Sequence, residues 1–220
     1  MNKVVSWFCK IFIKPIVNFC FIREVKGLEN IPKRNFILAS NHQSHLDWIV
    51  CGFFCVPRRF TYLGQVDRYT GFLGFGRRLL YFVAGVIPVN RKDKVSKEIA
   101  LKKAIEALKN GDILVIYPEG TRSQTGEIQR GKWGTAKIYL KTGVPILPTA
   151  IKGTFELFPP GKEFPKIKRI VKINIGRPLY FKKEEEKAKN LDYDSGEYQT
   201  LIQQITDKLM EEITHLYLQI

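Results

Sequence analysis

Six short apolar runs constrain the fold of this 220-residue chain more than any other feature. Each run is four to six residues long, as buried strands are. The runs lie at residues 36–39, 60–63, 86–89, 113–117, 146–151 and 170–175. Because helix-like stretches separate them, the sequence predicts an α/β fold, a single mixed-sheet domain flanked by helices.

The two clearest helices are predicted over residues 94–109 and about residues 198–218. Gly111 is placed to end the first helix. Its residues predicted to face the sheet are Val95, Ile99, Ile105 and Leu108. Those of the second are Leu201, Ile202, Ile205, Leu209, Ile213 and Leu216. Both sets recur every three or four residues or in multiples of that spacing, which predicts one buried face per helix.

The chain is strongly basic, with 36 Lys and Arg against 21 Asp and Glu and a net charge of +15. Residues 1–110 carry 19 basic and 7 acidic side chains, whereas residues 111–220 carry 17 and 14. This excess predicts an anionic partner for the first half, and nucleic acid, an acidic membrane or a phosphorylated small molecule would each fit. No stretch between charged residues exceeds twelve residues. A spanning helix needs about 20 apolar residues, so none is predicted.

The first 22 residues have the pattern of a basic amphipathic helix. On a helical wheel, Lys3, Lys10 and Lys14 fall within one narrow arc. The large apolar residues on the opposite side are Val5, Phe8, Phe12, Ile16 and Phe19. Such a helix lies in the membrane interface, and Pro15 predicts that it divides into two short helices. The alternative is a terminal helix whose apolar residues dock on its own domain.

We expect residues 1–27 to form this membrane-interfacial helical segment and residues 28–220 to form the α/β domain. Lys10 and Lys14 interrupt any secretory apolar core, so a signal peptide is not predicted. The expected location is the cytoplasmic face of the cell membrane, with the protein peripheral or monotopic.

Several familiar motifs are absent or incomplete. The cysteines form no C-x-x-C pair and accompany no zinc-type histidine spacing, which predicts buried, reduced thiols at Cys9, Cys20, Cys51 and Cys55. The sequence has neither a G-x-S-x-G nor an H-E-x-x-H motif, which weakens serine-hydrolase and zinc-protease interpretations. Residues 126–132 have phosphate-loop spacing, but Trp133 stands where Ser or Thr must bind Mg²⁺.

Two of the three histidines lie in residues 41–47, directly after an apolar run. α/β proteins place their sites at strand ends. On a continuous helix His42 and Asp47 would be about 140° apart, so they can meet only if His42 lies in the turn before a helix. Ser44 and Asp47 match a capping box that would begin the helix at Ser44. Asp47 then either only caps the helix, or orients one imidazole nitrogen so that the other acts as a base.

Two further segments end apolar runs with residues suited to phosphate. In residues 118–122, Gly120 permits a tight turn with converging N–H groups and Arg122 supplies a guanidinium fork. In residues 85–91, a strand-like run delivers Arg91 to the same edge. The simpler interpretation of the first segment is a plain strand-exit turn.

Taken in order, these segments resemble the glycerolipid acyltransferase family of the 1-acylglycerol-3-phosphate acyltransferases. The matching blocks are His42-x4-Asp47, Gly85 through Arg91, Pro118-Glu119-Gly120-Thr121-Arg122, and Val144 through Pro148. Four blocks in the right order over residues 41–148 are far more specific than any one of them.

The resemblance implies transfer of a fatty acyl group from acyl-CoA or acyl carrier protein to the sn-2 hydroxyl of 1-acylglycerol 3-phosphate, giving phosphatidic acid. His42 would be the general base and Asp47 its orienting partner. The residues implied to hold the glycerol phosphate are Arg91, Glu119, Gly120, Thr121 and Arg122. The resemblance implies no metal or prosthetic group and no nucleic acid partner.

One departure leaves the acceptor open. Residues 64–68 read Gly-Gln-Val-Asp-Arg where many relatives have a Lys-Glu-Leu-like stretch, so another lysophospholipid or glycerol 3-phosphate stays an alternative. The apolar, arginine-containing residues 48–82 either line an acyl channel or form ordinary core. Two other classes stay open: a non-catalytic nucleic-acid-binding module, for which no motif is present, and a lipid or thioester hydrolase.

Overall fold

The computed structural model of the chain describes residues 3–65 and 81–220. At its centre is a seven-stranded sheet with the strand order β1-β7-β6-β2-β5-β3-β4. The strands are β1 (Ile22–Lys26), β2 (Ile37–Ser40), β3 (Phe60–Gln65), β4 (Val86–Val89), β5 (Ile113–Ile116), β6 (Ile146–Lys152) and β7 (Val171–Ile175). Neighbouring strands are parallel except for β6 and β7. The predicted single mixed sheet is confirmed.

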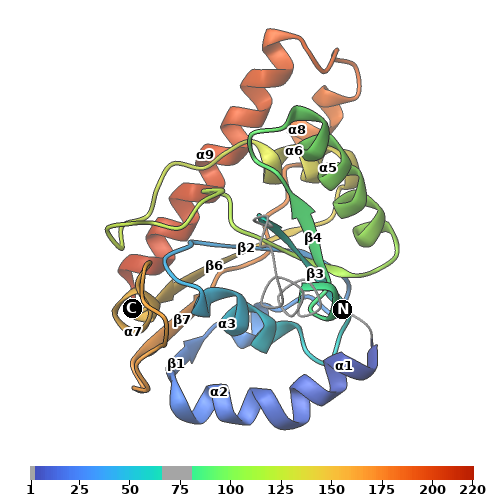
Figure 1. The fold of residues 1–220 in the computed structure, drawn as a ribbon. Helices are drawn as coiled ribbons and strands as arrows, with labels where there is room; N and C mark the ends of the chain where they lie inside the picture. The colour runs from blue at the N-terminus through green and yellow to red at the C-terminus, as the bar shows by residue number, and fades with distance from the viewer. Residues whose placement is uncertain (1–2, 66–80) are drawn as a thin grey trace.

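Helices cover both faces of this sheet (Figure 1). They are α1 (Lys3–Phe8), α2 (Lys14–Cys20), α3 (Leu46–Cys55), α5 (Lys94–Lys109), α6 (Gly134–Thr142), α7 (Thr154–Leu157), α8 (Lys182–Ala188) and α9 (Gly196–Leu218), with a π-helix at Cys9–Ile13 and a 3-10 helix at Leu28–Asn30. Leu38 of β2 packs in the core on the α3 side, whereas Ile37 and Ala39 pack in the core formed with α5, α6 and α9. Because both faces of β2 are covered, it is apolar at successive positions instead of alternating.

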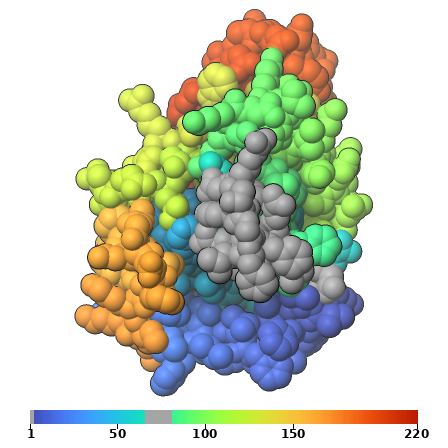
Figure 2. Space-filling view, viewed as in Figure 1, coloured from blue at the N-terminus to red at the C-terminus, as the bar shows by residue number. Residues whose placement is uncertain are grey.

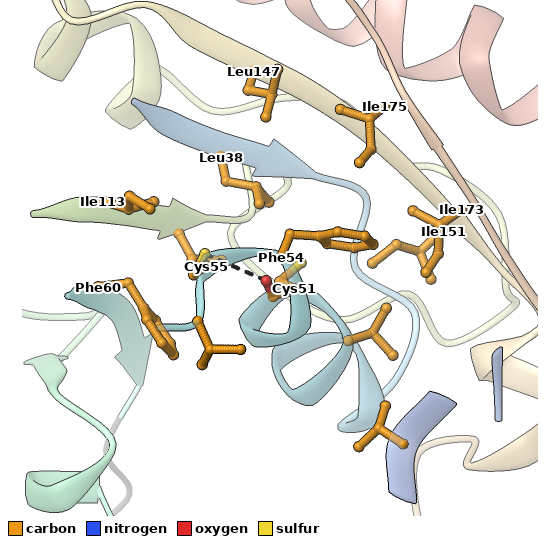
Figure 3. Close-up of a cluster of buried hydrophobic side chains, with 14 of the residues drawn as sticks. Leu38, Cys51, Phe54, Cys55, Phe60, Ile113, Leu147, Ile151, Ile173 and Ile175 are labelled. Atoms are coloured by element: carbon orange, nitrogen blue, oxygen red, sulfur yellow. Dashed lines mark hydrogen bonds between the residues drawn. The ribbon is translucent and has the colours of Figure 1, made fainter. Parts of the chain in front are cut away.

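The core beneath α3 contains two of the cysteines. Figure 3 shows sheet residues such as Leu38 and Ile113 pointing toward Cys51, Phe54 and Cys55 of α3. The Cys55 thiol donates to the Cys51 carbonyl oxygen at 3.4 Å, and burial raises the pKa of Cys55 to about 12. All four cysteines are free; two are buried as predicted, whereas Cys9 and Cys20 are only half-buried.

The predicted elements agree with the structure within one or two residues at each end, and the bounds of α5 are those predicted. The predicted buried face of α9 is also confirmed. The buried face predicted for α5 is wrong in part: Leu108 is buried and Ile105 partly buried, but Val95 and Ile99 are exposed, and α5 buries Ala100 and Ala104 in their place. Small alanines let a helix lie close to its neighbours. The prediction counted only large apolar residues and therefore left out the two alanines of the buried face.

The N-terminal segment is helical from Lys3 to Cys20 instead of dividing at Pro15, and a π-helix lies between α1 and α2. This proline lies in the first turn of α2, directly after the π-helix at Cys9–Ile13 that joins α2 to α1. A proline inside a helix lacks an N–H donor and its ring crowds the carbonyl four residues earlier, which the wider π turn accommodates. The division after residue 27 stays a prediction, and β1, on its N-terminal side, is an edge strand of the sheet.

Phe8, Phe12, Ile16 and Phe19 of the predicted apolar face point outward and Val5 is half-buried, which contradicts the alternative that this face docks on the domain. The segment docks instead through Ser6, whose Oγ donates to the Arg58 carbonyl oxygen at 2.8 Å, and through buried Val17. Lys14, which the helical wheel placed opposite the apolar residues, faces inward, with its Nζ 4.4 Å from the centroid of the Phe53 ring. The exposed large apolar residues are Val4, Trp7, Phe8, Ile11, Phe12, Ile13, Ile16 and Phe19.

In the part of the chain that the structure describes, no helix is both long and apolar enough to cross a membrane. Residues 66–80 of the predicted acyl-channel stretch, including Arg68, Arg77 and Arg78, lie outside the described residues. The same holds for residues 66–68 of the segment that departs from the family pattern.

Candidate active site

The candidate site lies where β2 and β5 end. These strands are parallel neighbours, with Ala39 opposite Ile116, so the chain leaves both at the same edge of the sheet. The segment after β2 carries His42, and the segment after β5 carries residues 117–123. The sheet topology therefore brings together two sequence blocks that are more than 70 residues apart.

His42 and Asp47 form a direct pair. The imidazole Nδ1 lies 2.8 Å from Asp47 Oδ2, and the Asp47 side chain is almost fully buried. A carboxylate can only accept, so in the neutral ring Nδ1 carries the proton and Nε2 is left unprotonated. The His42 side chain keeps 13% of its surface exposed, which leaves it accessible from one side. This arrangement suits a general base.

Asp47 also caps the helix, so its two alternative roles occur together. Its Oδ2 accepts the backbone N–H groups of Gln43 and Ser44, both at 2.7 Å, as well as the histidine. Ser44 Oγ accepts the N–H of Leu46, where α3 begins, two residues later than predicted. One buried carboxylate therefore begins α3 and fixes the His42 ring.

Glu119 holds the same turn from the other side. Its Oε1 accepts the His42 N–H at 2.7 Å and its Oε2 accepts the Gln129 N–H at 3.1 Å. The His42 carbonyl oxygen accepts the N–H of Ser123 at 2.8 Å. Glu119 is only 1% exposed, and this burial raises its pKa to about 7. Its carboxylate is directed at backbone groups of the site.

The turn after β5 contacts His42 and presents further polar groups. The Tyr117 ring stacks on the imidazole, with ring centroids 3.9 Å apart and planes 11° apart. Gly120 closes the turn at a φ of +69°, its N–H donating to the Tyr117 carbonyl oxygen at 2.9 Å. Thr121 and Arg122 follow and are half-buried. Sequence reasoning had assigned no role to Tyr117.

Lys132 is a second residue whose place in the site was missed. Its side chain lies against Gly120, where an added Cβ would meet Lys132 Cδ at 2.9 Å. Its N–H donates to the Pro118 carbonyl oxygen at 2.7 Å. From the sequence, Lys132 was considered only as part of the phosphate-loop spacing at residues 126–132, which Trp133 excludes. Lys132 lies there because residues 126–132 run back alongside the turn at residues 118–122. Local sequence spacing does not predict such a contact.

Arg91 reaches the same edge of the sheet but not the immediate surroundings of His42. It follows β4, which is separated from β2 by β5 and β3. At a strand spacing of about 4.8 Å, three steps place these two strand ends about 14 Å apart. The fourth block, residues 144–148, forms the start of β6, where Leu147 and Pro148 pair with Leu38 and Ala39. It therefore supports the strand that carries His42.

Buried polar side chains fix the remaining part of the turn at residues 41–44, which carries His42. Asn41 Nδ2 donates to the Ile151 carbonyl oxygen and Asn41 Oδ1 accepts the Ile151 N–H, both at 2.8 Å. Gln43 Nε2 donates to Tyr217 Oη of α9 at 3.2 Å and to the Gly126 carbonyl oxygen. The turn is therefore ordered by the protein itself, which pre-organises His42 without a substrate.

Known proteins share both the sequence and the fold. A 1-acyl-sn-glycerol-3-phosphate acyltransferase of Borreliella burgdorferi is 35% identical over 158 residues, 71% of this chain and 58% of that protein. A chloroplastic enzyme of the same name from Brassica napus is 30% identical over 165 residues, 74% of this chain and 46% of that protein. The chain thus spans about half the length of these relatives.

A solved structure extends the likeness over almost the whole chain. The crystal structure of the 1-acyl-sn-glycerophosphate (LPA) acyltransferase PlsC from Thermotoga maritima matches with a TM-score of 0.63 and 29% identity, covering 96% of this chain and 79% of that one. A model of the Acyltransferase family matches residues 22–152, from β1 to the end of β6, and so includes both turns of the site. The chain belongs to the acyltransferase family.

Proposed function

We propose that this chain transfers a fatty acyl group from an acyl thioester to the sn-2 hydroxyl of 1-acylglycerol 3-phosphate, giving phosphatidic acid. The observation that carries the proposal is the buried His42–Asp47 pair beside the phosphate-suited turn at residues 118–122. The activity named for the Borreliella and Brassica relatives supports the same reaction.

The proposed chemistry needs one base and no protein nucleophile. His42 Nε2 takes the proton of the acceptor hydroxyl as its oxygen attacks the thioester carbonyl. The carbon–oxygen bond forms, the carbon–sulfur bond breaks, and the thiolate leaves and recovers the proton from the imidazolium. Asp47 stabilises that imidazolium and holds the ring in place. A positioned base of this kind contributes about 10²- to 10⁴-fold in rate.

Cations around the turn would hold the acceptor phosphate. Arg122 follows β5, Lys132 lies against Gly120, and Arg91 lies farther along the same edge. Glu119 has a different place in this proposal. Since both of its oxygens accept backbone N–H groups, it positions His42 and does not need to contact the phosphate.

The test is acyl transfer by purified protein carrying His42→Ala, with His45→Ala as the matched control. Labelled acyl-CoA and acyl carrier protein are each supplied with lysophosphatidic acid, and the product is identified by mass. The parent and His45→Ala should form phosphatidic acid, and His42→Ala should lose at least about 100-fold in kcat while keeping its melting temperature. Near-parental turnover by His42→Ala would contradict general-base catalysis by His42.

The same assay separates the alternative functions. A panel of lysophospholipids and glycerol 3-phosphate identifies the acceptor, and the two donors compared at equal concentration identify the carrier. Free fatty acid released without an acceptor would favour a hydrolase. Binding to duplex nucleic acid in moderate salt, with no acyl transfer, would favour a nucleic-acid-binding module.

We propose further that residues 1–22 hold the enzyme on an anionic membrane surface at its cytoplasmic face. The support is the outward apolar face of α1, the π-helix and α2, together with the positive charge of the chain. A helix lying in the interface buries such a face in the boundary between headgroups and acyl chains. The lipid acceptor would then reach the site from the same surface.

A further inference from the structure

A second exposed apolar feature lies far from the N-terminus in the sequence. Residues 158–170 connect α7 to β7 without regular secondary structure. In this loop Phe164 is 81% exposed and Ile167 is 76% exposed, although large apolar side chains gain free energy by leaving water. Basic residues surround them: Lys162, Lys166, Lys168 and Arg169, against a single acidic Glu163. This combination of exposed apolar and basic side chains is typical of a surface that enters an anionic interface.

The loop is fixed to the His42 turn at its beginning. Ser44 Oγ donates to the Phe158 carbonyl oxygen at 2.7 Å, and the rings of His45 and Phe158 lie 5.8 Å apart. The Lys166 N–H then donates to the Leu157 carbonyl oxygen at 2.8 Å, which closes the loop at its base. The exposed residues are therefore held at a fixed place relative to the site.

The loop is fixed to the end of the N-terminal helices at its other side. Arg169 Nε donates to the Ile22 carbonyl oxygen at 2.6 Å, and the Val171 N–H donates to the Phe21 carbonyl oxygen at 2.9 Å. These two acceptors directly follow α2. Figure 2 shows the same neighbourhood, with the loop in orange at the side of the N-terminal helices in blue.

We infer that Phe164 and Ile167 form a second membrane-insertion point, which enters an anionic bilayer beside the outward face of α1 and α2. The inference rests on the proposed membrane-surface location and extends it to a segment about 140 residues away in the sequence. Charge complementarity and continuity with the N-terminal apolar face both favour a lipid surface as the partner. Two separate insertion points fix the orientation of the domain, so that the His42 turn, bonded to the loop, faces the bilayer in one pose.

The first experiment measures partition onto vesicles of phosphatidylcholine and phosphatidylglycerol, using the full chain carrying Phe164→Ser and Ile167→Ser. The matched control is Val95→Ser and Ile99→Ser, which removes two exposed apolar side chains from α5, packed over β4 and β5 at the other edge of the sheet. The loop variant should bind at least about tenfold more weakly, since two large side chains no longer leave water, whereas the control should bind as the parent does. Equal binding by the loop variant and the parent would overturn the inference.

The second experiment gives a positive signal. In a chain carrying Trp7→Phe, so that the N-terminal face holds no tryptophan, Phe164→Trp should add fluorescence that is quenched by lipid brominated on the acyl chain, and Ile99→Trp should add fluorescence that is not quenched. Absence of quenching at position 164 would overturn the inference. So would a parent dimer in solution that the loop variant loses, because the patch would then bind a second copy.

Both experiments measure binding without turnover, so their failure is distinct from failure of the proposed function. Acylation of a short-chain lysophosphatidic acid below its critical micelle concentration completes the separation. The loop variant should keep the parental rate on this dispersed acceptor and lose activity on vesicle-borne acceptor. A parent with no transfer activity at all would contradict the proposed reaction and leave the binding result intact.

Discussion

The His42 turn and the N-terminal segment reverse the usual distribution of residues in opposite ways. The turn buries polar and charged side chains, and Asn41, Gln43, Ser44, Asp47 and Glu119 are each 1% exposed or less. The segment exposes aromatic and aliphatic side chains, including Phe19 at 79%. Transfer from water to the protein interior is unfavourable for polar groups and favourable for apolar groups, so both arrangements cost free energy unless something compensates for them.

The two regions differ in what offsets this free-energy cost. In the turn, groups of the same chain bond most of the buried oxygens, including Asp47 Oδ2 and both oxygens of Glu119, although Asp47 Oδ1 is buried without a partner. In the segment, the described residues cover only the inner side, so the outer face needs a surface from outside the molecule. Substitutions in the turn should therefore change chemistry, and substitutions on the segment should change location.

The largest effect is expected from Asp47→Asn. The amide keeps the shape but no longer fixes the histidine tautomer or stabilises the imidazolium, so kcat should fall about 10²- to 10⁴-fold. Asp93→Asn is the matched control, because Asp93 caps α5 by accepting the Val95 N–H at 3.0 Å and has no histidine partner. Steady-state acyl transfer measures both. A loss of the same size in Asp93→Asn would mean that capping, and not the pair, explains the effect.

A large effect on location is expected from the combined variant Phe8→Ser, Phe12→Ser and Phe19→Ser. If each ring leaves water partially on binding, at about 1 kcal/mol per ring, affinity for anionic vesicles should fall about 100-fold. Co-sedimentation measures it, and kcat on a dispersed acceptor should stay parental. A control variant replaces three exposed aromatic residues elsewhere, Trp133, Tyr180 and Tyr193. Deleting the segment is a poorer test, since it would remove buried Val17 and Ile22.

A smaller effect is expected from the titration of Glu119. Its pKa is raised from 4.5 to about 7 by burial, so between these values the folded state binds more protons than the unfolded state. Its contribution to stability is therefore present below about pH 4.5 and is lost as pH rises through about 7. The free energy of unfolding of the parent minus that of Glu119→Gln should fall by about 2 kcal/mol from pH 5 to pH 8. Urea melts at both pH values measure this difference, and a flat difference would contradict the shift.

The smallest effect is expected at the outer side of the turn. Lys132→Ala removes one cation from beside Gly120, and an exposed charge contributes about 0.5–1 kcal/mol, so KM for lysophosphatidic acid should rise about two- to fivefold with little change in kcat. Lys137→Ala, one turn into α6, is the control. A fall in kcat without a change in KM would remove Lys132 from phosphate binding.

The fold was largely predictable because its signals are local. Strand-like runs, the bounds of α5 and the buried face of α9 follow from spacing within one element. The strand β1 was missed because Ile22–Lys26 alternates with charges at a sheet edge and has no continuous apolar run. The buried face of α5 was misjudged because close packing selected alanines over larger apolar residues.

The sequence alone determined which residues are candidates for the chemistry and in what order they follow along the chain, and it placed His42 before a helix. It also determined that the first segment has an apolar face. Only the tertiary structure decided that this face points outward, that Glu119 bonds the His42 backbone, that Lys132 lies against Gly120, and that Phe158 connects an exposed loop to Ser44. The physical reason is range: periodicity and capping act within a few residues, whereas these contacts join segments that only the order and direction of the strands bring together.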